Sequence, residues 1–265
     1  MPTLAAAQPL ISLDAVALDT ETTALDVHRA RVLQIGSVRI ERGRLRPEAT
    51  FSSLVDPGIP VPAVSTAIHG IDAAALRDAP GFAEAYQGWR AFAGDTVVIG
   101  HSLGFDLAVL QQECRNAGLR WSMPRVLDTS LLAQVANPAL PDASLDTVAA
   151  WLDVEMTDRH TALGDAFTAA RVFLALRPAL RERNIRTLAE AEAACRRLTR
   201  VLEDQYKAGW VEPVAVPPRD AEAAARIDSY PYRHRVRDVM RSPAAHIERG
   251  TSLGSAAQRM MQFGV

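Results

Sequence analysis

Lysine, cysteine, aromatic residues and long apolar runs are all scarce in this chain of 265 residues. Lys207 is the only lysine among 29 basic residues, and the net charge is -2. The chain therefore lacks the surplus of positive charge that is typical of proteins that coat duplex nucleic acid. We attribute the preference for arginine to codon bias in a GC-rich genome rather than to selection for phosphate contacts.

The two cysteines, Cys114 and Cys195, lie far apart and have no metal-like spacing. They predict two small buried thiols in a reduced, cytoplasmic compartment rather than a disulfide scaffold. No run approaches the ~18 apolar residues that a membrane span needs, so we expect no membrane partner. The first ten residues, MPTLAAAQPL, carry no basic segment and are interpreted as a short tail rather than a signal peptide.

Hydrophobic residues make up 48% of the chain, which is enough for a core of its own. Their spacing predicts strands at 13–21, 31–40, 46–55, 96–102 and 125–129, and helices at 80–94, 105–118 and in much of the chain after residue 129. The first three strands have short connections, one of them a turn at Gly43, and therefore predict an antiparallel meander. The order of the elements indicates an α/β fold with a mixed sheet flanked by helices.

Four segments are expected along the chain. Residues 1–12 form an N-terminal tail, and residues 13–183 form the α/β domain. Residues 184–230 are a polar helical segment followed by a Pro-containing linker, VEPVAVPPRD. Residues 231–265 have strand and helix signals of their own.

Carboxylates occur where a sheet protein ordinarily excludes them. Asp19 and Glu21, in VALDTETTALD, share one face of an expected strand and repel each other there. Asp106 and Asp165 lie near the starts of two expected helices, on or beside the apolar stripe. Either of these two alone could be a helix N-cap.

Four such acids together favour a different explanation. Buried carboxylates are unfavourable unless something compensates their charge, and divalent cations among them would do so. Hard oxygen ligands favour Mg²⁺ or Mn²⁺, and a pair of such ions can stabilise the attacking and leaving oxygens of a phosphoryl displacement. The thiolates or clustered histidines expected of a zinc site are missing.

His160 lies five residues before Asp165, in the loop that enters the expected helix. Histidine titrates near neutral pH and can take a proton from an attacking water, so it is the candidate general base. The alternative is a loop histidine that is simply exposed to solvent.

Three motifs occur in a specific order. VALDTETTAL, GHSLGFDLAVLQ and RHTALGDAFTAARVF resemble the three motifs of the DEDDh (DnaQ-like) 3′→5′ exonucleases, a family that includes the proofreading epsilon subunit of bacterial replicative DNA polymerase. The histidine five residues before the last aspartate marks the DEDDh branch. Shorter pieces between the motifs, such as IHGI and LDTSLLA, also have counterparts there. The resemblance covers about residues 13–183.

The resemblance implies an RNase H-like fold and a two-metal mechanism that removes nucleoside monophosphates from single-stranded 3′ ends, of DNA rather than RNA. The implied catalytic and metal-binding residues are Asp19, Glu21, Asp106, His160 and Asp165. The implied contacts to the terminal nucleotide come from Thr22, Thr23, His101 and Phe105. A hydrogen-bonding role that orders the strand end is equally open for His101.

Other functions are compatible with parts of this pattern. A non-catalytic nucleic-acid or nucleotide-sensing module, an RNase-type exonuclease and an RNase H-type endonuclease are the alternatives. The intact set of acids and His160 argues against the first, and the spacing of His160 argues against the last. No short Gln-Leu-rich clamp-binding motif follows Arg183, so we do not expect association with the replicative polymerase.

The C-terminal segment, with VRDVMRSP and TSLGSAAQRMMQFGV, is similar to the first half of a CBS motif. Complete CBS motifs pair to bind adenosine-type nucleotides, so the resemblance implies a truncated unit without a complete ligand site. The alternative is a Met-rich amphipathic helix that packs on the preceding domain.

Overall fold

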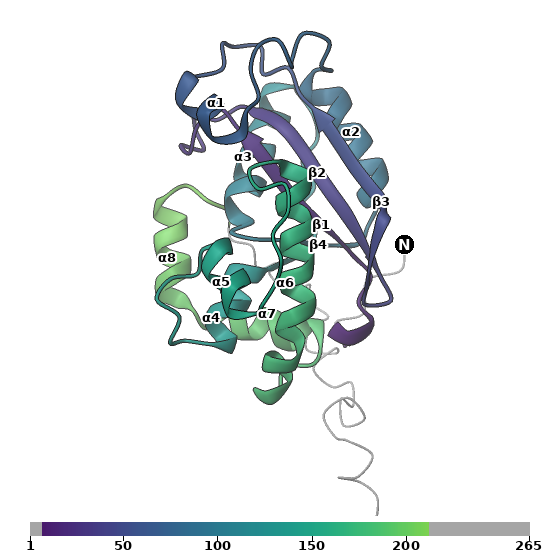
Figure 1. Ribbon diagram of the computed structural model, residues 1–265, viewed down its shortest axis with the longest axis vertical. Helices are drawn as coiled ribbons and strands as arrows, with labels where there is room; N and C mark the ends of the chain where they lie inside the picture. Colours follow the sequence, from purple (N-terminus) through teal and green to yellow (C-terminus); the bar gives the residue numbers. More distant parts are fainter. Residues whose placement is uncertain (1–6, 212–265) are drawn as a thin grey trace, which may run out of the picture. The chain divides into compact units, whose positions relative to one another are not determined.

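The computed structural model describes residues 7–211, in which a mixed sheet has helices on both faces (Figure 1). The strands are β1 Ala15–Thr22, β2 Val32–Glu41, β3 Arg44–Leu54, β4 Val97–Gly100 and β5 Val126–Asp128. The helices are α1 Ala63–His69, α2 Phe82–Ala93, α3 Gly104–Asn116, α4 Thr129–Ala136, α5 Leu145–Trp151, α6 Ala162–Glu182, α7 Leu188–Arg196 and α8 Thr199–Lys207, and a short 3-10 turn, η1 Leu10–Ser12, precedes them. The predicted α/β class is confirmed.

The strand order in the sheet is β3-β2-β1-β4-β5. The first three strands pair antiparallel, as predicted, whereas β4 pairs parallel with both β1 and β5. The carboxyl ends of β1, β4 and β5 therefore meet at one edge of the sheet, and β1 is its central strand. Side chains that follow these strands are brought close together in this way.

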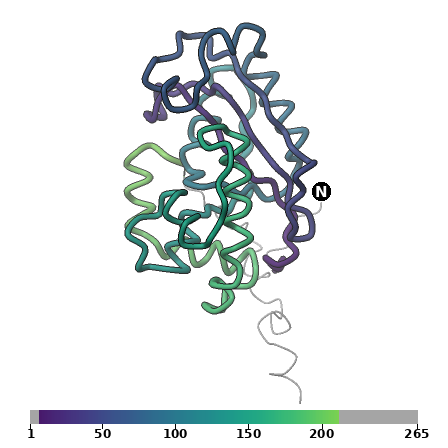
Figure 2. The backbone as a smooth tube through the Cα atoms, viewed as in Figure 1, coloured from purple at the N-terminus to yellow at the C-terminus, as the bar shows by residue number. Residues whose placement is uncertain are grey.

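Alternate residues of β1 face two separate apolar layers. Ala15 and Ala17 belong to an apolar cluster with side chains of α4, α5, α6 and α7, while Val16 and Leu18 belong to a second cluster with side chains of α2 and α3. Both figures of the chain trace show α6 crossing one face of the sheet (Figures 1 and 2). Because β1 alternates its faces, the side of Ala15 and Ala17 also carries Asp19 and Glu21.

Three regions differ from the sequence-based expectation. The proline-rich stretch after β3 leads into α1, a mostly exposed helix of 7 residues that has too little apolar periodicity to be predicted. The segment expected to be helical over 184–210 is two helices, α7 and α8. Residues 8–12 pack on the domain rather than forming a free tail: Pro9 bridges Thr187, and Leu10 is buried.

Helix α7 belongs to the apolar layer that covers the α6 face of the sheet. It begins with a capping box, in which Thr187 and Glu190 each bind the backbone of the other, as the sequence TLAE favours. Leu188, Ala191 and Cys195 are buried in that layer. Residues beyond Arg183 thus contribute to the core.

Cys195 and Cys114 are both buried and unpaired, as predicted for two small buried thiols. Within residues 7–211, no helix combines the length and the apolar character that crossing a membrane requires. The predicted CBS-like segment at 231–265 and all but the first residue of the Pro-containing linker lie outside the described residues.

Candidate metal centre

Asp19 and Glu21 lie at the carboxyl end of β1, just beyond the point where β4 stops pairing with it. On the β2 side they face Gly36 and Gln34. On the other side the ladder to β4 ends at Ala17. The end of β1 is therefore open on one side for side chains from elsewhere in the chain.

Asp106, in the first turn of α3, fills part of this gap. Its Oδ1 accepts the backbone N–H of Thr20 at 2.9 Å and the hydroxyl of Thr20 at 2.6 Å. Leu103 is the N-cap of α3, so Asp106 is not the helix cap that the sequence left open as an alternative. The carboxylate instead completes the hydrogen bonding of β1 and is fixed beside the two acids of that strand.

Asp165, in the first turn of α6, approaches from the opposite helix layer. The N-cap of α6 is Thr161, whose hydroxyl oxygen accepts the N–H of Gly164, so Asp165 is not a cap either. Its Oδ2 accepts bonds from Nη1 of Arg159 at 2.6 Å and from the backbone N–H of His160 at 3.3 Å. Its Oδ1 is buried and has no hydrogen-bond partner.

The position of α6 depends on a close approach of its first turn to β2. A Cβ atom on Gly36 would lie 2.2 Å from the backbone carbon of Ala162, so only glycine fits there. The backbone N–H of Ala162 donates to Oε1 of Gln34 at 3.0 Å. These two contacts bring Asp165 over the end of β1.

The three acids of β1 and α6 form a compact cluster. One carboxylate oxygen each from Asp19, Glu21 and Asp165 lie within 4.8 Å of one another. Burial is the largest cause that raises the pKa of Asp19 well above its usual value, and repulsion from the other carboxylates adds to it. Burial also raises the pKa of Glu21 to about 7.

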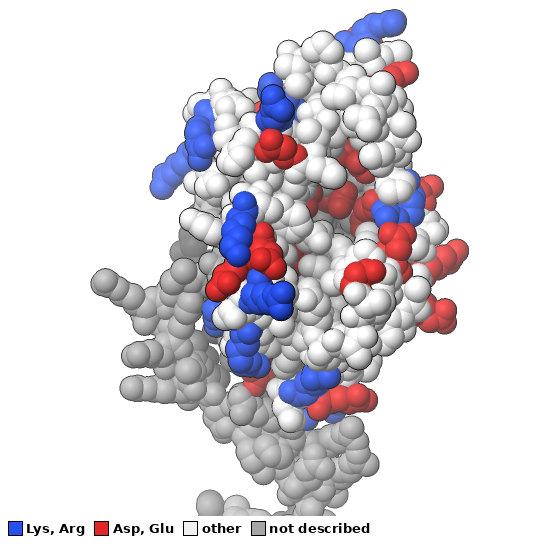
Figure 3. Space-filling model, turned by 90° about the vertical axis from the view of Figure 1, so that its left-hand side faces the viewer, with Lys and Arg blue, Asp and Glu red and all other residues white. Residues whose placement is uncertain are grey.

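Asp106 extends this electrostatic pattern. Burial raises its pKa to about 7, although the bonds from Thr20 act in the opposite direction. Figure 3 shows acidic side chains in a hollow on one face of the molecule. Raised pKa values of several neighbouring carboxylates indicate a site that disfavours negative charge unless a cation is present.

The residues present fit a hard divalent cation. Such ions bind carboxylate oxygens, and the cluster offers three residues at close range with Asp106 beside them. A buried carboxylate oxygen without a partner is unfavourable, and Oδ1 of Asp165 is therefore an oxygen that a cation could bind. Of the predicted acids, the structure brings all four together.

His160 lies on the loop that precedes α6, next to the cluster. Its side chain is exposed, and its backbone has a φ of 61°, in the left-handed region that non-glycine residues rarely adopt. Its backbone N–H is bound to Asp165, which places the residue at the edge of the site. His160, the predicted general base, therefore lies beside the carboxylate cluster with its side chain exposed to solvent.

Arg159 is a residue of the site that the sequence did not identify. Its guanidinium group binds Asp165 and, at 2.8 Å, Asp146 of α5. An arginine next to a candidate histidine gives no periodic or motif signal in a chain in which nearly every basic residue is arginine. Its partners become visible only when α5 and α6 are packed together.

Three of the residues predicted to contact the nucleotide, Thr22, Thr23 and Phe105, lie next to the carboxylates in the sequence. Thr22 and Thr23 are buried just after the carboxylates, and the hydroxyl oxygen of Thr23 accepts the N–H of Arg31 at 3.0 Å. Phe105 precedes Asp106 and packs edge-on against Trp210, with ring centres 6.0 Å apart. These three residues therefore border the cluster.

Both ring nitrogens of His101 are engaged. Nδ1 lies 2.9 Å from the hydroxyl of Thr129, and Nε2 lies 2.8 Å from the carbonyl of Ala143. Burial lowers the pKa of the His101 ring, so the neutral form is favoured, with Nε2–H donating to the carbonyl. This geometry corresponds to the ordering role that the sequence left open.

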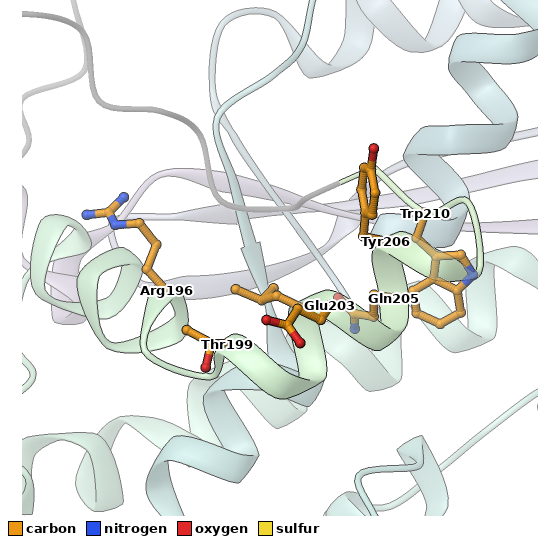
Figure 4. A pocket seen from close by; sticks show the side chains of 7 residues that line it. Arg196, Thr199, Glu203, Gln205, Tyr206 and Trp210 are labelled. Carbon is orange, nitrogen blue, oxygen red and sulfur yellow. The ribbon is translucent and has the colours of Figure 1, made fainter.

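A separate pocket of about 290 Å³ lies along α8, and none of the predicted site residues lines it (Figure 4). Its lining includes Glu203, Tyr206 and Trp210. Trp210 connects the wall of this pocket to Phe105 through the aromatic contact described above.

The comparisons with known proteins agree with this geometry. A family model described as "Exonuclease" matches residues 16–173. A "DNA polymerase III subunit epsilon-like protein" of Rhodobacter capsulatus is 39% identical over 199 residues, which are 74% of this chain and 28% of the relative. A "DNA polymerase III PolC-type" of Caldanaerobacter subterraneus is 30% identical over 66% of this chain and 12% of the relative. The chain therefore spans only a minor part of these relatives.

Solved structures show the same fold at low sequence identity. Exonuclease X in complex with 5′ overhanging duplex DNA superposes with a TM-score of 0.54 at 21% identity, covering 68% of this chain and 98% of that one. The nuclease domain of 3′hExo, a DEDDh family member bound to rAMP, gives a TM-score of 0.50 at 16% identity. The match covers 60% of this chain and 88% of that one. The expected RNase H-like fold is confirmed.

Proposed function

The chain belongs to the RNase T exonuclease family, and on that basis we propose that it is a divalent-metal-dependent 3′→5′ exonuclease that removes nucleoside monophosphates from single-stranded ends. The observation that carries this proposal is the cluster of Asp19, Glu21 and Asp165, with the buried Oδ1 of Asp165 left without a partner. Carboxylates with a purely structural role would each be paired with a cation of the protein, whereas among the described residues of this cluster only Asp165 has an ion pair, with Arg159. Here the arrangement offers oxygen atoms to a cation from solution.

Asp19, Glu21 and Asp165 would hold the first Mg²⁺ or Mn²⁺ ion, and Asp19 with Asp106 would hold the second. Bound ions would neutralise the carboxylates and stabilise negative charge on the attacking and leaving oxygens. The hydrogen bonds from Thr20 fix Oδ1 of Asp106, which leaves its Oδ2 for this purpose. The work of the protein is to hold these oxygens in place before the substrate arrives.

His160 would take the proton from the attacking water. Its exposed ring lies on a loop that is held to Asp165 through the backbone, so it can reach solvent without entering the carboxylate cluster. A neutral imidazole near physiological pH is suited to this transfer. The proton can then leave to bulk solvent.

Thr22, Thr23 and Phe105 would contact the 3′-terminal nucleotide. They border the cluster, and an aromatic ring can stack on any base, as single-strand binding requires. The net charge of -2 is compatible with a substrate whose end makes few phosphate contacts. We propose DNA as the substrate because the relatives are named for DNA polymerase III and Exonuclease X was solved with DNA, whereas 3′hExo with rAMP represents the RNA alternative.

The test uses 5′-labelled single-stranded DNA and RNA of the same sequence with Mg²⁺ or Mn²⁺. We expect a ladder that shortens from the 3′ end, that EDTA abolishes, and that is faster on DNA. Asp19→Ala should be inactive, whereas Asp95→Ala, at an exposed aspartate before β4, should keep full activity. Cuts that begin internally, or equal inertness of wild type and Asp19→Ala, would refute the proposal.

A further inference from the structure

Arg159 bridges two acids from different helices. Nη1 lies 2.6 Å from Oδ2 of Asp165, and Nη2 lies 2.8 Å from Oδ2 of Asp146. The side chain of Asp165 is only 8% exposed, while that of Asp146 is 58% exposed. The guanidinium group therefore spans from the solvent side of α5 to the buried carboxylate of α6, as its planar, two-armed shape allows.

The two oxygens of Asp165 are used differently. Oδ2 accepts from Arg159 and from the backbone N–H of His160. Oδ1 is buried and has no partner. With Oδ2 held by two donors, rotation of the carboxylate is restricted, and Oδ1 is the oxygen that stays free for a cation at the cluster with Asp19 and Glu21.

The same bridge also fixes the loop that carries His160. The side chain of Arg159 and the backbone N–H of the next residue converge on one oxygen, and the loop adopts a left-handed φ at His160. Asp146 anchors the other end of the bridge to α5, which packs on α6. Arg159 thereby ties the loop to both helices.

We propose that Arg159 is a positioning residue: its bridge from Asp146 to Asp165 aims Oδ1 of Asp165 at the cation and holds His160 beside it. This inference rests on the exonuclease function proposed above. Hydrogen-bond partners of metal ligands typically change metal affinity or activity by about 10- to 100-fold when they are removed. Arg159 would touch neither the substrate nor the reacting atoms.

The sign of the effect on cation binding separates positioning from charge. Arg159 carries a positive charge beside the cluster, so its electrostatic effect alone disfavours a cation. Removing that charge should then strengthen cation binding. Removing a positioning contact should weaken it, because Asp165 is no longer held in the binding orientation.

The experiment measures binding of Mn²⁺ by electron paramagnetic resonance in the absence of substrate, together with kcat and KM on single-stranded DNA. For Arg159→Ala we expect Mn²⁺ affinity and kcat to fall on the order of 10-fold each, with KM little changed. Guanidinium ion at millimolar concentration should restore part of kcat in this variant. Asp146→Asn should show a smaller loss, and no further loss when it is combined with Arg159→Ala.

Arg171→Ala is the matched control. Arg171 holds the same loop through the carbonyl of Glu155, at 3.0 Å, and within residues 7–211 it forms no hydrogen bond or ion pair with the four carboxylates of the site. Its variant should keep Mn²⁺ affinity and kcat near wild type. Arg159→Lys, which keeps the charge but cannot bind both acids in the same way, should remain folded and lose part of both quantities.

Unchanged or stronger Mn²⁺ binding by Arg159→Ala, or equal losses in Arg171→Ala, would overturn the inference. Failure of wild type itself to bind Mn²⁺ or to degrade DNA would instead overturn the proposed function. Thermal unfolding of each variant shows whether the fold is kept. If Arg159→Ala does not fold, the same comparison is made with Arg159→Lys and Asp146→Asn.

Discussion

Two of the carboxylate environments in the described residues compensate negative charge in opposite ways. Glu113 of α3 binds the side chain of Arg31 at 2.7 Å, and Glu192 of α7 binds Arg125 through both of its oxygens, at 2.6 and 2.9 Å. Each of these glutamates has its own arginine. At the end of β1, Asp19 and Glu21 face two further acids and have only Arg159 nearby, which binds Asp165.

The contrast separates acids that are paired within the protein from acids that we propose bind a cation. A buried carboxylate that is paired with a cation of the protein holds two elements together, and breaking the pair destabilises the fold. A cluster of acids whose pKa values are raised by burial destabilises the fold while it lacks a cation. Under the proposed function a cation from solution offsets this cost, so the two regions should respond differently to the same kind of substitution.

The largest expected effect is the loss of activity in Asp19→Asn. The substitution keeps the size of the side chain and removes a charge that would bind both ions, so we expect exonuclease activity to fall on the order of 10⁴-fold. Stability without metal should not fall, because a buried charge is removed. A variant that unfolded more easily than wild type in EDTA would contradict the distinction between the two regions.

His160→Gln should have the next largest effect. The proposed base is lost while the carboxylates stay, so kcat should fall on the order of 10³-fold with Mn²⁺ affinity retained. Calorimetric titration with Mn²⁺ and single-turnover kinetics on the same preparation measure both quantities. Loss of Mn²⁺ binding in this variant would contradict the role as a base and would add His160 to the residues that bind the metal.

Glu192→Gln tests the paired region and should show the reverse pattern. Breaking a buried ion pair typically costs about 3–5 kcal/mol. The side chain of Arg125 is 21% exposed, which lowers the expected loss in free energy of unfolding to about 2–3 kcal/mol. Activity of the folded protein should be close to wild type. Urea unfolding measures the free energy of unfolding, and the assay on 5′-labelled DNA measures the activity. A large loss of kcat with unchanged stability would contradict the structural role of Glu192.

The sequence predicted most of the fold because the main elements have strong periodicity and clear ends. The alternation along β1 and the turn at Gly43 gave the meander, and the same alternation placed Asp19 and Glu21 on one face. The spacing of Asp106 and Asp165 from their helix starts placed them correctly in the first turns of α3 and α6. These are local properties of the chain.

What the sequence could not predict depends on contacts between distant residues. The bridge of Arg159 joins two helices, and the pair of Arg125 and Glu192 joins residues that are 67 positions apart. The close approach of α6 to Gly36 likewise involves a residue of β2 that looks like any other glycine in a strand. Packing, rather than local propensity, determines which charges become partners.

The smallest expected effect concerns the pH dependence of stability without metal. The pKa of Glu21 in the folded protein is raised from 4.5 to about 7, so between these values the folded state binds more protons than the unfolded state. The contribution of Glu21 to stability without metal is therefore fully present below about pH 4.5 and is lost as the pH rises through about 7. Glu21→Gln cannot lose this proton, so it should flatten the fall. The gain at pH 8 should be about 1 kcal/mol, less than the full shift implies, because Glu21 is half-buried and water screens its charge. Thermal unfolding in EDTA from pH 5 to 8 measures the difference in stability between wild type and Glu21→Gln. Saturating Mg²⁺ should raise the melting temperature of wild type more than that of the variant. If wild type gained stability over this range of pH, the acids at the end of β1 would be compensated by the protein itself, as Glu113 and Glu192 are.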